Sequence, residues 1–128
     1  MKKIYEDLIG IPFKCGGRDT IHIDCYGLAM LIYDRLGIKL PEFGASEDFS
    51  IINQLIKDGE NYFEKLEEPE PFCLVVFTIR EPFVSHIGIV LEDCNKFIHV
   101  MAKRATVIER LDDLSWHHRI KGFYKWKV

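Results

Sequence analysis

The hydrophobic pattern of this chain changes its period once, after Pro69 and Pro71, and this change constrains the fold more than any other feature. Before that point apolar residues recur at helical spacing, and beyond it they form short runs between turns. The helical patterns cover residues 1–9, 25–36 and 47–58. The strand patterns cover residues 72–79, 85–91, 96–101, 105–110 and 120–128. Helices followed by strands predict an α+β fold, with N-terminal helices packed on a five- to six-stranded antiparallel sheet.

Length and charge narrow the classes of function. A single domain is expected to include residues 1–128. The formal net charge of −3 gives no electrostatic reason to expect nucleic acid as a partner. Every apolar run is shorter than the roughly 18 residues of a membrane span, so membrane insertion is not expected. Acidic residues stand near the N-terminus where a signal peptide has its apolar segment, so we expect no Sec-type export signal.

A cysteine begins the second predicted helix. Asp24 is a residue type that caps helix N-termini, and Cys25 follows it at the head of the apolar face. The positive end of the helix dipole favours a thiolate, so the position predicts a lowered thiol pKa and a nucleophile at Cys25. The other three cysteines show no C-x-x-C spacing and are interpreted as reduced, structural or incidental thiols: Cys15, Cys73 and Cys94.

Two histidines are predicted to lie on one face of a β-hairpin. Residues 92–95, Glu-Asp-Cys-Asn, join two predicted strands and are typical of a turn. A two- or four-residue connection pairs Gly88 with His99 and makes His86 a diagonal neighbour of His99, with Gly88 leaving space beside them. A three- or five-residue connection would put the histidines on opposite faces.

Together these residues predict a nucleophile with a base. His86 would take the proton from Cys25, and His99 would orient His86 as the third member of a triad. Two alternatives stay open. Each histidine can be an ordinary core or surface residue, and the same three side chains could hold zinc in a hydrolase.

The motifs resemble those of a known family in order and spacing. They lie at residues 10–17, 24–28, 40–41, 85–90 and 97–99. This series resembles the NlpC-type papain-like cysteine peptidases, which cut peptidoglycan stem peptides. The resemblance implies the papain-like NlpC-type fold and a Cys25, His86, His99 triad that needs no metal or cofactor. It also implies hydrolysis of γ-D-glutamyl to diamino-acid bonds through a thioester.

The same resemblance implies residues that bind the substrate. Asp24 matches an aspartate that helps to hold the free amine of the substrate's terminal alanine. Phe13 and Tyr26 stand where many cell-wall members have a tyrosine and a serine. Gly88, beside the histidines, completes the predicted substrate-binding set.

A narrower resemblance is to members found in phage tails and prophages. It depends on Tyr26 directly after the cysteine and on the C-terminal phrase at residues 120–126. It implies synthesis in the bacterial cytoplasm and delivery to the cell wall in a phage tail, with tail proteins as partners. An alternative of another class is a tail-assembly or structural component that keeps the fold and works by binding.

Overall fold

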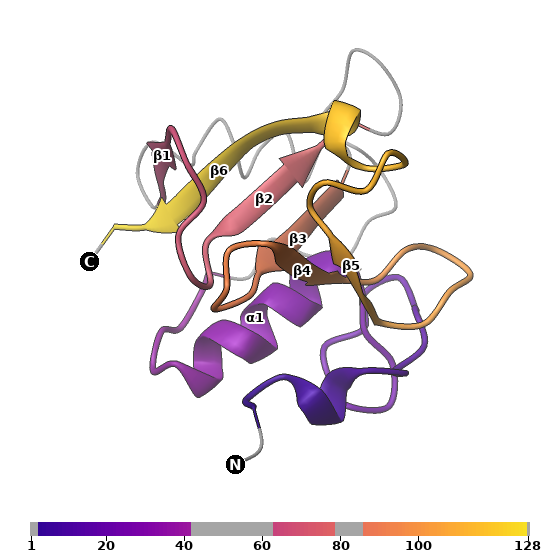
Figure 1. The fold of residues 1–128 in the computed structure, drawn as a ribbon. Coiled ribbons are helices and arrows are strands. Elements are labelled where there is room, and N and C mark those ends of the chain that lie inside the picture. Colours follow the sequence, from indigo (N-terminus) through magenta and orange to yellow (C-terminus); the bar gives the residue numbers. More distant parts are fainter. Residues whose placement is uncertain (1–2, 42–62, 79–85, 128) are drawn as a thin grey trace.

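The structure is a computed structural model that describes residues 3–41, 63–78 and 86–127 (Figure 1). These residues form an α-helix, a six-stranded sheet and two short 3₁₀ turns. The elements are η1 (Glu6–Leu8), α1 (Cys25–Arg35), β1 (Phe63–Leu66), β2 (Leu74–Phe77), β3 (His86–Val90), β4 (Lys96–His99), β5 (Val107–Arg110), η2 (His117–Arg119) and β6 (Ile120–Trp126).

The sheet is antiparallel throughout, with the strand order β1-β6-β2-β3-β4-β5. Helix α1 packs on one face of it, against β3 (Figure 1). The central strands contribute alternate residues to that core, Leu74, Val76, Ile87, Ile89 and Ile98, and the edge strand β1 contributes Phe63. The predicted α+β class and antiparallel sheet are confirmed.

A second core lies on the opposite face of the sheet. It contains Cys73, Val75, Phe77, Val90, Phe97, Leu111 and Trp116. Because apolar side chains cover both faces of β2 and β3, every residue of these strands is buried. This burial on both faces explains why the sequence of these two strands is largely apolar instead of alternating.

The hairpin of β3 and β4 has the predicted register. Ile89 pairs with Ile98 and Val90 pairs with Phe97. Beyond the strand ends, the Leu91 N–H donates to the Lys96 carbonyl at 2.9 Å, so the connection has the four residues 92–95. Since side chains alternate along a strand, this register puts both hairpin histidines on the face away from α1.

Three expectations differ from the structure or lie outside it. The helix predicted over residues 1–9 is reduced to η1, because Gly10 has φ = 93° and its N–H donates to the Thr106 carbonyl at 2.8 Å. Strand β1 was not predicted, since two of its four residues are charged and it pairs only at the edge of the sheet. The helix predicted over residues 47–58 lies outside the described residues.

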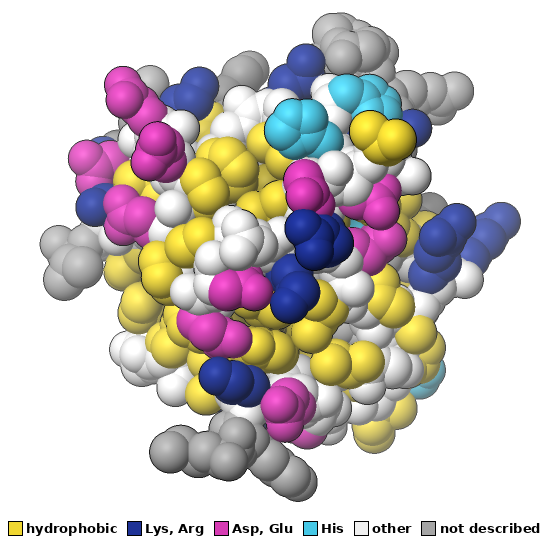
Figure 2. All heavy atoms as spheres, viewed as in Figure 1, with side chains coloured by type: hydrophobic (Ala, Val, Ile, Leu, Met, Phe, Trp, Pro, Cys, Tyr) yellow, Lys and Arg dark blue, Asp and Glu magenta, His cyan; other side chains and the backbone are white. Residues whose placement is uncertain are grey.

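The surface carries both signs of charge. Figure 2 shows acidic and basic side chains interspersed among apolar ones on the face in view. Among the helices of the described ranges, none has the length and apolar content that crossing a membrane would require.

Candidate active site

Helix α1 begins at Cys25 because Asp24 caps it. Asp24 has extended backbone angles, φ −105° and ψ 178°, and its Oδ1 accepts the Gly27 N–H at 2.6 Å. This contact satisfies an N–H group that the first turn of a helix otherwise leaves open. The predicted cap is therefore confirmed, and it fixes the cysteine as the first helical residue.

Close backbone packing holds the preceding loop against this helix start. The Asp24 N–H donates to the Gly17 carbonyl at 3.2 Å. A Cβ atom on Gly27 would lie 2.2 Å from the same carbonyl oxygen, so only glycine fits there. On the other side of the loop, the Phe13 N–H donates to the Arg104 carbonyl at 2.9 Å, which ties the loop to the chain after β4.

The thiol of Cys25 contacts the sheet at β3. Backbone hydrogen bonds from Ile87 and Tyr26 reach the thiol and lower its pKa, but burial and the Asp24 carboxylate together raise that pKa to about 12. The predicted lowering of the pKa is therefore wrong, because desolvation and a neighbouring negative charge outweigh the donors at the helix start.

The two predicted histidines are in direct contact. His86 Nε2 lies 2.8 Å from His99 Nδ1, and both rings are buried, with 4% and 1% of their surface exposed. His99 Nε2 lies 2.5 Å from Oε2 of Glu109 on β5. Three adjacent strands thus contribute one continuous chain of hydrogen bonds that begins at His86 and ends on a carboxylate.

Aromatic rings enclose this histidine pair. His99 meets Trp116 edge to face at 4.7 Å between ring centroids, and His86 lies 5.7 Å from Phe77. Burial, and then the neighbouring His99, lower the pKa of His86 to about 3. Burial also lowers the pKa of His99, against the opposing effect of Glu109. Both rings are therefore neutral at pH 7, the state in which an imidazole can act as a base.

Cys25 and His86 come from adjacent points of the fold. Each is the first residue of its element, α1 or β3, and the thiol bonds the Ile87 backbone one residue beyond His86. Within the described ranges, the side-chain hydrogen bond of His86 goes to His99. Contact between the His86 ring and the sulfur is accordingly a part of the proposal made below.

The sequence matches the NlpC/P60 family over residues 10–125. The chain belongs to the NlpC/P60 family. The match covers the cysteine, both histidines and Glu109. A comparison with curated proteins found no match.

Solved structures show the same fold as this NlpC/P60 chain. An NLP/P60 family protein from Staphylococcus aureus, described as similar to lipoprotein, superposes with a TM-score of 0.66 at 24% identity over 95% of this chain and 39% of its own. NlpC1 from Trichomonas vaginalis gives 0.72 at 15% identity, over 98% of this chain and 42% of its own. The NlpC/p60 domain of the peptidoglycan hydrolase SagA gives 0.63 at 15% identity, over 95% and 92%. The chain thus spans about two fifths of the first two proteins.

In this NlpC/P60 chain the Asp24 carboxylate is occupied by donors of the protein itself. Oδ1 accepts from the Arg18 guanidinium and from the Gly27 N–H, each at 2.6 Å. Oδ2 accepts the Gly16 N–H at 3.0 Å. The carboxylate predicted to hold a substrate amine is already paired with a cation of its own chain.

The other predicted substrate-binding residues lie around the helix start and the histidines. Tyr26 is buried and donates its hydroxyl hydrogen to the Pro41 carbonyl, while Phe13 is half-buried against the same core. Gly88 is buried as well. A Cβ there would lie 2.9 Å from a side-chain atom of Phe97 and 3.3 Å from one of His99, so little space is left beside it. The space beside the histidines is filled by Phe97, and the substrate-binding roles stay predictions.

Sequence reasoning missed three residues of this site. Glu109 carried a signal, because it pairs with Phe97 across β4 and β5 and is thereby a diagonal neighbour of His99. Trp116 carried none, since it lies in a loop whose path no local pattern predicts. Arg18 carried none either, as a single cation in an irregular loop.

The remaining candidates fall outside the site. In the described part of the chain, no group of three histidine, cysteine or acidic side chains is placed to hold a metal ion, so the zinc alternative has no preformed site there. All four cysteines are free, as predicted. His22, His117 and His118 are exposed.

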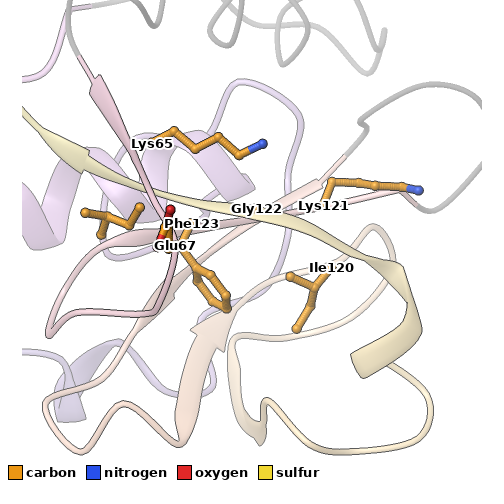
Figure 3. A pocket seen from close by; sticks show the side chains of 7 residues that line it. Lys65, Glu67, Ile120, Lys121, Gly122 and Phe123 are labelled. Atoms are coloured by element: carbon orange, nitrogen blue, oxygen red, sulfur yellow. The ribbon is translucent and has the colours of Figure 1, made fainter.

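An open pocket of about 670 Å³ lies along β1 and β6 (Figure 3). It is lined by Lys65, Leu66, Glu67, Ile120, Lys121, Gly122 and Phe123. None of these belongs to the cysteine and histidine cluster, so the pocket is not part of the candidate active site.

Proposed function

We propose that this NlpC/P60 chain is a cysteine peptidase that hydrolyses an amide bond in peptidoglycan stem peptides. The observation that carries the proposal is that the thiol of the helix-start Cys25 bonds the Ile87 backbone, one residue beyond His86 of the buried His86 and His99 pair. Membership of the family adds support. So does the fold shared with the domain of a protein described as a peptidoglycan hydrolase.

The proposed reaction starts from a neutral thiol and a neutral imidazole. His86 uses Nε2 for His99, so Nδ1 is the nitrogen left to act as the base. As Sγ of Cys25 attacks the carbonyl carbon of the substrate, its proton passes to Nδ1 of His86. The backbone N–H of Cys25 at the helix start is the proposed donor to the oxyanion.

The acyl-enzyme then forms in one step and is hydrolysed in a second. The His86 imidazolium gives its proton to the leaving amine as the C–N bond breaks, which leaves a thioester on Cys25. A water molecule gives a proton to His86 while its oxygen attacks the thioester carbon. As the C–S bond breaks, His86 passes that proton to Sγ, which restores the thiol and releases the acid. Both steps require Nδ1 to come within hydrogen-bond reach of the sulfur in the substrate complex.

For the scissile bond, we propose the γ-D-glutamyl to diamino-acid linkage. The pairing of Asp24 with Arg18 argues for a substrate that does not depend on a salt bridge from its free amine to Asp24. We further propose that the protein is made in the cytoplasm and delivered to the cell wall by a phage tail, on the basis of Tyr26 and the phrase at residues 120–126. That phrase also forms β6, between β1 and β2, so it has a structural role of its own.

The experiment is digestion of muropeptides from several wall chemistries, with products identified by mass spectrometry. The parent protein should release the products of amide cleavage, whereas Cys25→Ala should release none. Cys94→Ala is the matched control and should cleave like the parent. A chelator should leave the activity unchanged. If the parent protein cleaves none of these substrates, the peptidase proposal is wrong, and the alternative of a tail-assembly or structural component that works by binding is favoured.

A further inference from the structure

The hydrogen-bond chain from His86 does not end at the predicted triad. It continues from His99 Nε2 to Oε2 of Glu109 at 2.5 Å, after the 2.8 Å contact between the two rings. The members lie on β3, β4 and β5, which are adjacent in the sheet. Each link therefore depends on the register of neighbouring strands and not on a flexible loop.

The end of the chain determines where the protons lie. A carboxylate can only accept hydrogen bonds, so His99 must carry its proton on Nε2. A neutral His99 then has a bare Nδ1, which can only accept, and His86 must donate from Nε2. A neutral His86 protonated on Nε2 has a bare Nδ1, the nitrogen that a base needs.

We propose that Glu109 is a positioning residue that fixes the tautomers of both imidazoles and thereby keeps Nδ1 of His86 free to accept a proton. The catalytic consequence rests on the proposed function, whereas the tautomers themselves do not.

Among its described neighbours, Glu109 is the residue that accepts the hydrogen bond from Nε2 of His99. The ring is 1% exposed and lies against Phe97 and Trp116, at 4.6 Å and 4.7 Å between ring centroids, which offer no carboxylate acceptor. Among the residues that the structure describes, the charged groups that act on it are Glu109 and Arg104, and the positive charge of Arg104 opposes a further proton on the ring. Without Glu109 the Nε2–H of His99 loses its acceptor. If the proton of His99 then moves to Nδ1, His99 becomes the donor to Nε2 of His86, and the proton of His86 must lie on its Nδ1.

Two substitutions separate the acceptor from its charge. Glu109→Gln keeps an oxygen that can accept from His99 Nε2 and removes the negative charge. Glu109→Leu removes both and preserves the apolar part of the side chain. Glu64→Leu is the matched control, because Glu64 also lies on an edge strand, β1, at the other end of the sheet.

The first test reads the tautomers by nitrogen-15 NMR of histidine-labelled full-length protein at pH 7. Parent, Glu109→Gln and Glu64→Leu should show both rings protonated on Nε2. Glu109→Leu should show at least one of the two rings protonated on Nδ1. A parent with a proton on either Nδ1, or a Glu109→Leu variant with unchanged tautomers, overturns the proposal whether or not the protein cleaves any substrate.

The second test measures muropeptide cleavage. Glu109→Leu should lose about 100-fold in kcat with little change in KM, because general acid–base catalysis contributes at least that much. Glu109→Gln should lose only about 10-fold, since the base is kept in place. Equal kcat values for the parent and Glu109→Leu would contradict the assignment. An inactive parent would instead count against the proposed function, and the NMR result would still decide the tautomers.

Discussion

Acid should destabilise this protein through its buried histidines. The pKa of His86 falls from an ordinary 6.5 to about 3 in the folded chain, because the ring is buried and His99 lies next to it. A base with a depressed folded pKa contributes stability above the unfolded pKa and loses it as the pH falls toward the folded pKa. Lowering the pH from 7 to 5 should therefore remove about 2 kcal/mol of unfolding free energy through His86 alone.

Urea unfolding at pH 7, 6 and 5 measures this effect. The parent should lose stability steeply, whereas His86→Gln should show a slope lower by about 1.4 kcal/mol per pH unit below pH 6. His117→Gln, which changes an exposed histidine, is the control and should follow the parent. Parallel profiles for the parent and His86→Gln would refute the assignment of a neutral, buried ring.

Three further results follow from the helix start. At pH 7 iodoacetamide should modify Cys25 about 50-fold more slowly than an ordinary thiol. The raised pKa reduces the thiolate fraction of Cys25 more than it increases the nucleophilicity of the thiolate. An alkylation rate that stops rising below pH 8 would contradict this. Asp24→Asn should speed that alkylation, because it removes the negative charge that raises the thiol pKa while the asparagine still caps the helix. Unchanged rates would show that the Asp24 charge does not control the thiol pKa. Gly27→Ala should cost about 1–2 kcal/mol of unfolding free energy despite the better helix propensity of alanine, and Gly122→Ala, which meets only side-chain atoms, should cost less.

The features that sequence predicted correctly are local ones. The cap at Asp24 depends on a few consecutive residues, and the hairpin register follows from a four-residue turn. Together they are sufficient to place His86 and His99 on one face of the sheet. Since both rules are stereochemical, no knowledge of the rest of the fold was required.

The features that sequence missed depend on contacts between distant residues. Trp116 reaches the histidines from a loop beyond β5, and Glu109 contacts His99 only because β5 pairs with β4. The thiol pKa was predicted in the wrong direction for a related reason. A helix start is visible in the sequence, but the desolvation that opposes a thiolate comes from packing of the partly buried Cys25 against the core.

Capping and thiol chemistry compete for the same carboxylate. Asp24 holds the helix start that positions Cys25, yet its negative charge raises the pKa of that thiol. Arg18 balances part of this charge at 2.6 Å from Oδ1. A site built in this way holds a neutral thiol at rest, so the proposed reaction requires a proton to move to His86 during the attack on substrate. In that reaction the tautomer proposed to be fixed by Glu109 would matter more than a thiolate formed beforehand.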